Sequence, residues 1–414
     1  MKILHTADIH LGSNAYGRVD PATGLNTRLL DFKRSFEFMV QRALDEDIDL
    51  FLFAGDAYRT ADPTPTQQRT FAECLKPIAD AGIPIAMVVG NHDHPVSYGK
   101  ASALDIFSYV TGDVHLFRRP DKTVIQTKSG PLQFLALPWP IRSMLLAKED
   151  FRKMTPLEVR TFIETMYTQF LEQAVTDLDP ALPTVLACHL SAQGAELSGS
   201  ERTSLIAHEP KFTVAQLAQP GIDYVALGHI HRHQDLNAGK KPPVVYSSSI
   251  ERITFKEWEE TKGFVLVDID TSGDEKQTSY TFVPTPARPF VAVYADAEES
   301  ADPTTTILNA IAAHDITDAV VRVRYKIHEG QVGQVDLSRL REALKPCATI
   351  ASIERSVTLI ERQRRTVVTR ESSLEDAMGH YITQREDLHP LRNTLVKAAL
   401  ELEAEDEARR RDET

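Results

Sequence analysis

Five short clusters of polar side chains in this 414-residue sequence have the types and spacing needed to bind metal ions. The clusters are Asp8-Ile9-His10, Gly55-Asp56, Gly90-Asn91-His92-Asp93, Cys188-His189 and Gly228-His229-Ile230-His231. We interpret Cys188 as a buried strand residue, so the donors are imidazole nitrogen and carboxylate or amide oxygen. That set suits manganese, iron or zinc better than calcium. A carboxylate such as Asp56 can bridge two ions about 3.5 to 4 Å apart, as in two-metal phosphoesterases.

The predicted positions of the clusters place them in one crevice. Each follows a predicted strand, and ligands bind beyond the carboxyl ends of strands in an open α/β sheet. Alternation along an extended backbone would turn Asp8 and His10 to the same side, and likewise His229 and His231. Taken singly, each cluster has an ordinary explanation as a turn, a cap or a satisfied polar pair. Those explanations do not account for the joint order of the clusters on successive strand ends, which favours a shared site.

The elements that must position these clusters are typical of an α/β layered core. Apolar runs predict strands at 3–7, 49–54 and 83–89, separated by amphipathic helices at 28–46 and 66–81. Further strands are predicted at 132–137, 184–190, 224–227, 244–246, 263–268 and 280–283, and a long helix at 156–177. Because few helices separate the strands after residue 114, we expect added antiparallel pairs there.

Three prolines, at 284, 286 and 289, predict a boundary near residue 285. The division expected from this is 1–285, then a small α/β unit at 286–365, then helices at 366–414. A capping-box pattern at Ser372 and Glu375 begins the helical part, and His389-Pro390 interrupts it. An apolar seam, which packs either on another helix or on the chain's own domain, is formed by Leu388, Leu391, Leu395, Ala398 and Leu402.

Composition sets limits on the function. The three cysteines, odd in number and widely spaced, suit a reducing cytoplasm, and no apolar run approaches the length of a membrane span. We read the first residues as a strand, not a secretory signal. A net charge of −13 is unlike that of an autonomous DNA-binding domain, so binding to DNA would need metal cations, a basic patch or a partner chain. Basic residues that either contact phosphates or form a solvated face are Arg118, Arg119, Lys122, Lys128, Arg142, Arg152, Lys153, Arg362, Arg364 and Arg365.

The five clusters resemble the motifs D-x-H, G-D, G-N-H-D/E, H and G-H-x-H of the calcineurin-like metallophosphoesterase superfamily. More closely, six segments are similar to the bacterial SbcD nuclease family, relatives of the meiotic-recombination nucleases that process double-strand breaks. These segments lie at 5–12, 55–63, 90–95, 194–202, 226–234 and 244–255. The resemblance implies a β-sandwich flanked by helices over 1–285, a capping domain over 286–365 that restricts the approach of DNA, and a helical region over 366–414 that docks a partner.

The resemblance also implies a role for each site residue. It implies two divalent ions, manganese by preference, with magnesium, iron or zinc as alternatives. One ion would be held by Asp8, His10 and His231, and the other by Asn91, His189 and His229. Asp56 would bridge the two ions. His92 is expected over the scissile phosphate as a protonated catalytic group. His5, His94 and His233 are expected to be structural or to support ligands, and Asp93 to orient a histidine. Arg59 stands where eukaryotic and archaeal relatives have a second catalytic histidine, and Ser248 stands where glycine is frequent.

The function implied is a manganese-dependent DNA nuclease subunit, with double-strand exonuclease and hairpin or single-strand endonuclease activity. It would act in DNA end processing, repair, recombination and replication, in the cytoplasm and associated with the nucleoid. The partners implied are double-stranded DNA ends and hairpins and an SbcC-type SMC-like ATPase, with this chain a homodimer within a heterotetramer. The alternative on the same metal core is a phosphomonoesterase or cyclic-nucleotide phosphodiesterase. No G-x-x-x-x-G-K-[ST] loop occurs, so the chain is not itself expected to hydrolyse ATP.

Overall fold

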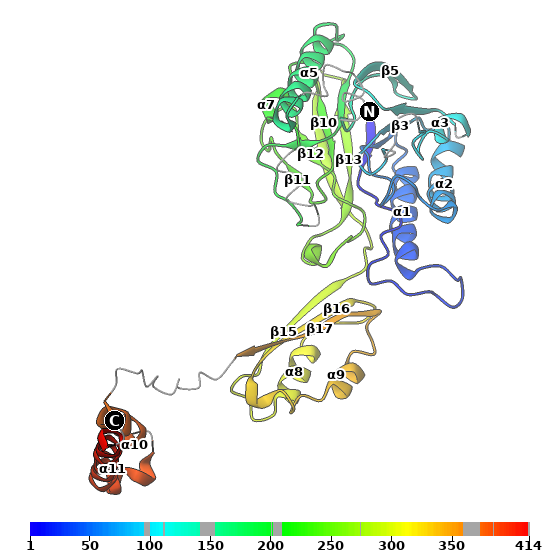
Figure 1. Ribbon diagram of the computed structural model, residues 1–414. Coiled ribbons are helices and arrows are strands. Elements are labelled where there is room, and N and C mark those ends of the chain that lie inside the picture. Colours follow the sequence, from blue (N-terminus) through cyan, green and yellow to red (C-terminus); the bar gives the residue numbers. More distant parts are fainter. Residues whose placement is uncertain are drawn as a thin grey trace.

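Two six-stranded sheets pack face to face in the first part of the chain (Figure 1). The computed structural model describes residues 1–94, 100–110, 112–140, 154–199, 201, 209–273, 275–358, 373–383 and 385–412. The first sheet has the order β14-β13-β1-β2-β3-β4. Its strands are β1 (Lys2–Thr6), β2 (Leu50–Phe53), β3 (Ile85–Val88), β4 (Val114–Phe117), β13 (Gly263–Asp270) and β14 (Gln277–Pro284). Strands β1 to β4 are parallel, and β13 joins β1 antiparallel.

The second sheet has the order β11-β12-β10-β7-β6-β5. Its strands are β5 (Asp121–Thr127), β6 (Gly130–Leu137), β7 (Thr184–His189), β10 (Tyr224–Gly228), β11 (Gln234–Asp235) and β12 (Val244–Tyr246). The expectation of antiparallel pairs after residue 114 is correct for β5–β6, β11–β12 and β13–β14 but wrong for the centre of this sheet. There β6, β7, β10 and β12 run parallel. The helices α5 (Pro156–Thr176) and α7 (Val214–Leu217) lie in two of the crossovers, and four-residue α7 is too short to give a periodic signal.

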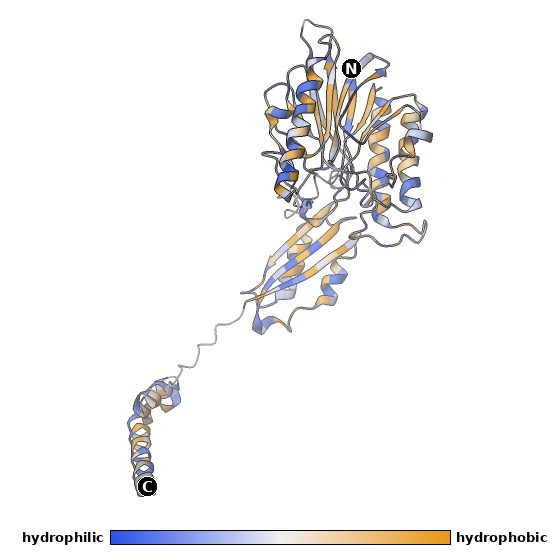
Figure 2. Cartoon of the chain, turned by 45° about the horizontal axis from the view of Figure 1, so that its top comes forward, coloured by the Kyte–Doolittle hydropathy of each residue, from blue (hydrophilic) through white to orange (hydrophobic). Residues whose placement is uncertain are grey.

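The two sheets share a hydrophobic core, and helices cover their outer faces. Along β2, Leu50 and Leu52 point into the core between the sheets, whereas Phe51 and Phe53 pack under the helices. Burial on both faces is why these strands read as continuous apolar runs. Helices α1 (Thr27–Asp45) and α2 (Pro65–Asp80) cover the first sheet, and α5 and α7 cover the second (Figure 1). Figure 2 shows hydrophobic residues gathered along the strands. The predicted layered α/β fold is confirmed.

Shorter elements connect these layers. They are α3 (Phe107–Val110), β8 (Ser191–Ala192), β9 (Lys211–Phe212) and the 3₁₀ turn η2 (Phe255–Glu257). Strand β8 follows β7 directly, and η2 follows β12. Because β7 and β12 end at the edge where the polar clusters lie, the pair β8–β9 and η2 border this edge.

A separate small core follows β14. Three parallel strands, β15 (Phe290–Asp296), β16 (Val320–His328) and β17 (Thr349–Thr358), are covered on one face by α8 (Pro303–Ala312) and α9 (Leu337–Ala343), with a 3₁₀ turn η3 at Glu329–Gln331. Side chains alternate across β16, so that Val321, Val323 and Tyr325 pack on the helices. The described residues of this segment contain both strands and helices, as predicted for a small α/β unit, and residues 359–365 lie outside them.

Helices α10 (Leu374–Thr383) and α11 (Arg392–Asp412) are separated by a 3₁₀ segment η4 at Glu386–Leu391. The predicted interruption at His389-Pro390 is therefore confirmed, because proline cannot donate the helical hydrogen bond. The predicted cap is displaced by one residue: Ser373 accepts from the N–H of Asp376, and Ser372 lies outside the described residues. In the described parts of the chain, no helix is both long and apolar enough to span a membrane.

Candidate metal centre

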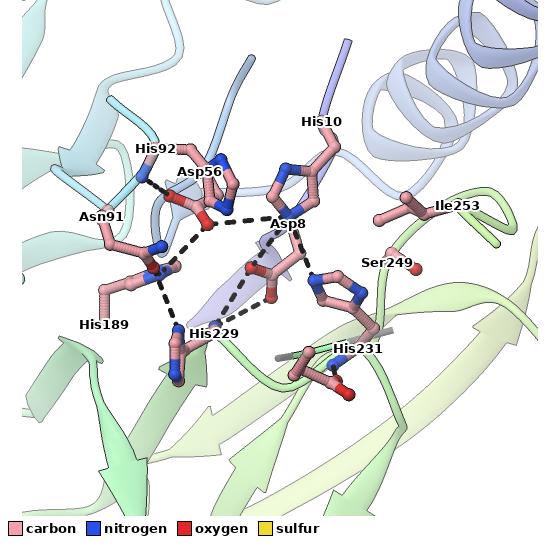
Figure 3. A network of polar contacts seen from close by, with 12 residues as sticks. Asp8, His10, Asp56, Asn91, His92, His189, His229, His231, Ser249 and Ile253 are labelled. Atoms are coloured by element: carbon pink, nitrogen blue, oxygen red, sulfur yellow. Dashed lines mark hydrogen bonds and ion pairs between the residues drawn. The ribbon is translucent and has the colours of Figure 1, made fainter. Parts of the chain in front are cut away.

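The polar clusters converge at one edge of the sandwich (Figure 3). Asp8, Asp56 and Asn91 lie in the turns after β1, β2 and β3 of the first sheet, while His189 ends β7 and His229 follows β10 of the second. Since all five strands are parallel within their sheets, their carboxyl ends open to the same side. The site is thus built across the interface between the two sheets.

The ligand-bearing turns are not extended, which corrects the expectation from strand alternation. Asp8, His10, Asp56 and His229 have φ values of 54°, 48°, 61° and 96°. Left-handed backbone at non-glycine residues costs of the order of 1 to 3 kcal/mol each and concentrates at functional sites. Hydrogen bonds between adjacent turns hold this geometry: the N–H of Asp8 donates to the Gly55 carbonyl at 2.8 Å, and that of His10 to the Asp56 carbonyl at 3.0 Å. Tight left-handed turns, rather than pleating, aim these side chains.

Four side chains form the first half of the site. The Nε2 atoms of His10 and His231 face each other at 3.0 Å. His10 Nε2 also lies 3.6 Å from Asp56 Oδ2 and 4.0 Å from Asp8 Oδ1. The N–H of His229 donates to both carboxylate oxygens of Asp8, at 3.1 and 2.9 Å, and so fixes its plane. These side chains are almost completely buried, so the converging donors are shielded from water.

His189 belongs to the second half of the site. Its Nδ1 donates to the Ala54 carbonyl at 2.7 Å, which in the neutral ring leaves the lone pair of Nε2 pointing inward. That nitrogen lies 3.0 Å from Asn91 Oδ1 and 3.4 Å from Asp56 Oδ2. Asp56 Oδ2 therefore lies within 3.6 Å of a histidine on either side, the position expected of a bridging carboxylate.

His229 completes the second half of the site, and its hydrogen bonds indicate whether a cation fits there. Its Nε2 donates to Glu209 Oε2 at 2.9 Å, so the neutral ring presents the lone pair of Nδ1 to Asn91 Oδ1 at 3.0 Å. Lone pairs of His189 and His229 thus converge on one amide oxygen. Acceptor atoms at this separation repel one another unless a positive charge lies between them, so this donor set fits a divalent ion.

The electrostatics of the pocket favour positive charge. Burial disfavours the charged forms of His189 and His231, but neighbouring carboxylates outweigh it. Asp56 chiefly raises the pKa of His189 to about 9, and Glu257 and Asp8 raise that of His231 to about 9. Burial likewise opposes ionisation of Asp56, yet the surrounding histidines hold its pKa well below the usual value. A proton and a metal ion would therefore compete for the same place.

His92 lies at the open side of the site. Its backbone N–H donates to Asp56 Oδ1 at 2.8 Å, and its Nδ1 donates to the carbonyl of Arg59 at 2.8 Å. The ring is half-buried and packs edge-on against His10, with 4.7 Å between ring centroids. Because Nδ1 is held by a carbonyl, Nε2 is the nitrogen available to a substrate.

Glycines allow the turns to approach closely. A Cβ atom added to Gly228 would lie 2.1 Å from the Ala54 carbonyl oxygen, which is the acceptor for His189. One added to Gly90 would lie 2.2 Å from Asp56 Oδ1. Side chains larger than hydrogen cannot fit at these two positions without moving the ligands.

The flanking polar residues are structural, with one correction. His5 bonds Tyr224 and, because of its burial, has its pKa lowered to about 3; His233 bonds the carbonyl of Tyr246. His94 bonds the Trp139 carbonyl at 3.3 Å. The expectation that Asp93 orients a histidine is wrong. Its carboxylate instead accepts from the backbone N–H groups of Gly90, Asp56 and Ala57, so it shapes the turns that carry the ligands.

Sequence reasoning missed the groups that hold the ligands. Glu257 contacts His231 Nδ1 at 3.3 Å, Glu209 bonds His229, and Glu201 accepts from the N–H of His231. Glu201 lies inside the SbcD-like segment 194–202, and Glu257 lies two residues beyond the segment 244–255. The spacing of residues along the sequence does not identify either glutamate as a partner of a histidine. The ring of Trp139 also packs on that of His229, with centroids 4.9 Å apart.

The basic residues predicted between 118 and 153 are largely paired where the structure describes them. Arg118 forms an ion pair with Asp105, Lys128 with Asp47, and Lys122 donates to the Ala174 carbonyl. These contacts favour the solvated-face interpretation for those three residues. Six further positions lie outside the described residues: Arg142, Arg152, Lys153, Arg362, Arg364 and Arg365.

Comparison with known proteins defines the class. The model of the calcineurin-like phosphoesterase family matches residues 1–233, and the chain belongs to that family. It is similar to the SbcD subunit of the nuclease SbcCD from Bacillus subtilis, with 30% identity over 65% of this chain and 66% of that one. It is also similar to the protein of the same name from Staphylococcus epidermidis, with 28% identity over 72% and 74%. The predicted family resemblance is confirmed.

Solved structures matched by the fold share little sequence with this chain. The protein TT1561 of Thermus thermophilus is 13% identical, with a TM-score of 0.36, and covers 67% of this chain and 97% of that one. A dimetal phosphatase from Danio rerio is 8% identical, with a TM-score of 0.37, and covers 67% and 98%. The family model and the observed His and Asp groups together support a binuclear metal site.

Proposed function

We propose that this chain is the manganese-dependent nuclease subunit of an SbcCD-type complex, which cleaves phosphodiester bonds in DNA ends and hairpins. The observation that carries the proposal is the convergence of imidazole and carboxylate groups around Asp56, in a chain similar to two proteins named as SbcD subunits of the nuclease SbcCD. We place its activity in the cytoplasm, in association with the nucleoid, in DNA repair, recombination and replication.

In this proposal Asp8, His10 and His231 hold one ion, Asn91, His189 and His229 hold the other, and Asp56 bridges them. Two such ions would neutralise a phosphodiester and lower the pKa of water toward about 7. The distances around Asp56 and the inward lone pairs support this arrangement. The chain's own part is to hold the donors rigidly and to exclude bulk water from the buried side.

His92 is proposed as the group that donates a proton to the leaving oxygen or stabilises charge on the phosphate. The Arg59 carbonyl fixes its ring through Nδ1, which supports a role for Nε2 toward the substrate. No second histidine follows Asp56 at the third position, where the side chain of Arg59 is exposed. A single histidine would therefore carry the acid–base chemistry.

A nuclease assay with manganese tests this function. The wild-type chain should cleave duplex ends, and His92→Ala should retain manganese but lose roughly 10²- to 10⁴-fold in turnover. His314→Ala, at an exposed histidine that follows α8 and bonds the Ala310 carbonyl, is the matched control and should cleave normally. Cleavage by His92→Ala at the wild-type rate would remove His92 from the mechanism. A phosphate monoester or a cyclic nucleotide hydrolysed faster than DNA would favour the alternative phosphoesterase.

The proposed partner is an SMC-like ATPase that docks on the C-terminal helices. Leu391 and Leu402 of the predicted seam are 50% and 65% exposed, so the seam is available for another helix. We propose the division 1–285 nuclease domain, 286–365 capping domain and 366–414 docking region, in a homodimer within a heterotetramer.

Deletion of residues 371–414 should abolish co-purification with the ATPase. Leu402→Asp should weaken it, because a charge in an apolar seam disfavours packing. Leu337→Asp, at an apolar residue of α9 that is 43% exposed, is the control and should leave binding intact. Undiminished binding after the deletion would reject the docking proposal.

A further inference from the structure

One segment, residues 250–262, touches both the candidate metal centre and the unit of β15, β16 and β17; we call it the strap. Its turn η2 places Glu257 against the metal centre. The Glu257 side chain is completely buried, and its Oε1 lies 3.3 Å from His231 Nδ1. Its other oxygen accepts from the N–H of Ile253 at 3.0 Å, which fixes the carboxylate plane.

Lys262 fastens the same contact from the end of the strap. Its buried ammonium group lies 2.8 Å from Glu257 Oε2 and 2.8 Å from Glu260 Oε2. It also donates to the carbonyl of His231 at 3.1 Å. His231 is therefore held at its ring by Glu257 and at its backbone by Lys262, so that moving the strap would move this histidine.

The other side of the strap packs on the β15–β17 unit. The ring centroids of Phe255 and Phe290 lie 5.5 Å apart. The guanidinium carbon of Arg322 stacks on the ring of Phe255, 4.0 Å from its centroid. Phe255 and Phe290 form a buried cluster with Val320, and Phe255 is only two residues from Glu257 in the same 3₁₀ turn. A displacement at the ring is therefore transmitted over a single short turn.

A second contact fastens the strap to the segment that enters this unit. Glu251 accepts from the N–H of Arg288 at 3.0 Å, and Arg252 donates to the Arg288 carbonyl at 3.0 Å. Arg288 in turn bonds both carboxylate oxygens of the buried Asp31 on α1. Residues beyond β14 therefore contact the strap at two points, at Phe255 and at Glu251–Arg252.

We infer that Glu257 is a positioning residue for His231 and that, through Phe255 and Arg322, the affinity of the ion held by His231 depends on the contact between the strap and the β15–β17 unit. This inference rests on the proposed metal site. Carboxylates that orient metal-binding histidines contribute roughly 10- to 100-fold to metal affinity. A contact that acts through such a carboxylate modulates binding by roughly 2- to 30-fold.

Titration of the full-length chain with Mn²⁺, followed by the electron paramagnetic resonance signal of free manganese, tests the inference. Glu257→Ala should weaken one of two sites by roughly 10- to 100-fold, and Glu257→Gln, which keeps an acceptor for Nδ1, should restore part of the loss. Arg322→Ala should weaken the same site by roughly 2- to 30-fold although it touches no ligand. Phe255→Leu, which keeps an apolar side chain, should act in the same direction.

Arg324→Ala is the matched control. Arg324 lies on the same strand and, like Arg322, pairs with Glu354, but the stacking contact on Phe255 belongs to Arg322. Manganese binding should be unchanged in this variant. Two results would overturn the coupling while the wild type still binds two ions. One is wild-type manganese affinity in both Arg322→Ala and Phe255→Leu, and the other is a loss of affinity in Arg324→Ala equal to that in Arg322→Ala. A wild-type chain that binds no manganese refutes the metal site itself, and the coupling with it.

Discussion

Replacement of Lys262 by methionine should destabilise the protein far more than removal of a surface lysine charge. The ammonium group is fully buried and lies within 2.8 Å of carboxylate oxygens of Glu257 and Glu260. Methionine keeps most of the volume but leaves Glu257, also fully buried, without its lysine partner. Removing one partner of a buried ion pair costs roughly 3 to 5 kcal/mol. At about 2 to 4 °C per kcal/mol, the melting temperature should fall by about 6 to 20 °C.

Thermal unfolding followed by circular dichroism measures this loss. The control is Lys76→Met, where the lysine is 68% exposed and pairs with Asp80 on the surface of α2, so little stability should be lost. The double variant Lys262→Met with Glu257→Leu should recover part of the loss, because no buried charge is left unpaired. A melting temperature for Lys262→Met that equals that of the control would refute the assignment of the buried pair.

The pH dependence of this stability has a defined sign. Burial disfavours the ionised form of Glu257, but Lys262 and His231 outweigh it and hold its pKa well below the usual value for a glutamate. A carboxyl group of this kind stabilises the fold fully above about pH 4.5, and the contribution is lost as the pH falls through the lowered pKa. In Lys262→Met the pKa of Glu257 lies closer to the usual value, so the loss of stability on acidification below about pH 4.5 should be smaller than in the wild type.

Three further predictions follow from the metal centre. Asp56→Asn should reduce the bound manganese measured by mass spectrometry from two ions to one or none, and an unchanged metal count would contradict the bridging role. Manganese affinity should rise between about pH 6 and about pH 9, because His189 and His231, each with a pKa near 9, must lose a proton to bind; a flat calorimetric profile would contradict this competition. Gly228→Ala should cost roughly 1 to 3 kcal/mol and weaken metal binding, because the new methyl group displaces the Ala54 carbonyl; wild-type melting and affinity would contradict the close approach.

The elements of the first sheet could be predicted from the sequence because each carries a strong local signal. Strands β1 to β3 are buried on both faces and read as apolar runs, and α1 buries the residues that its periodicity marks. The parallel centre of the second sheet could not be predicted in the same way. Strand pairing is a long-range property, and the turn α7 between β7 and β10 is too short to reveal the crossover.

The side chains proposed to bind metal could be picked out from the sequence, but the backbone geometry that orients them could not. Pleating predicts that Asp8 and His10 lie together, whereas their left-handed backbone depends on hydrogen bonds to the turn after β2. Glu209 and Glu257 lie 20 and 26 residues from the histidines that they hold. Nothing in their neighbours along the chain distinguishes them from solvated glutamates, because only the fold creates their contacts.

Strand β1 lies between β2 and β13, so its hydrogen bonds on one side are supplied by residues 263–270. During synthesis, the turn that presents Asp8 and His10 would lack this neighbour until residues 263–270 had left the ribosome. A nascent or prematurely terminated chain would therefore carry every proposed ligand without the strand that supports two of them on one side. Chemistry that could damage nucleic acid would thus begin only after strand β13 had been made.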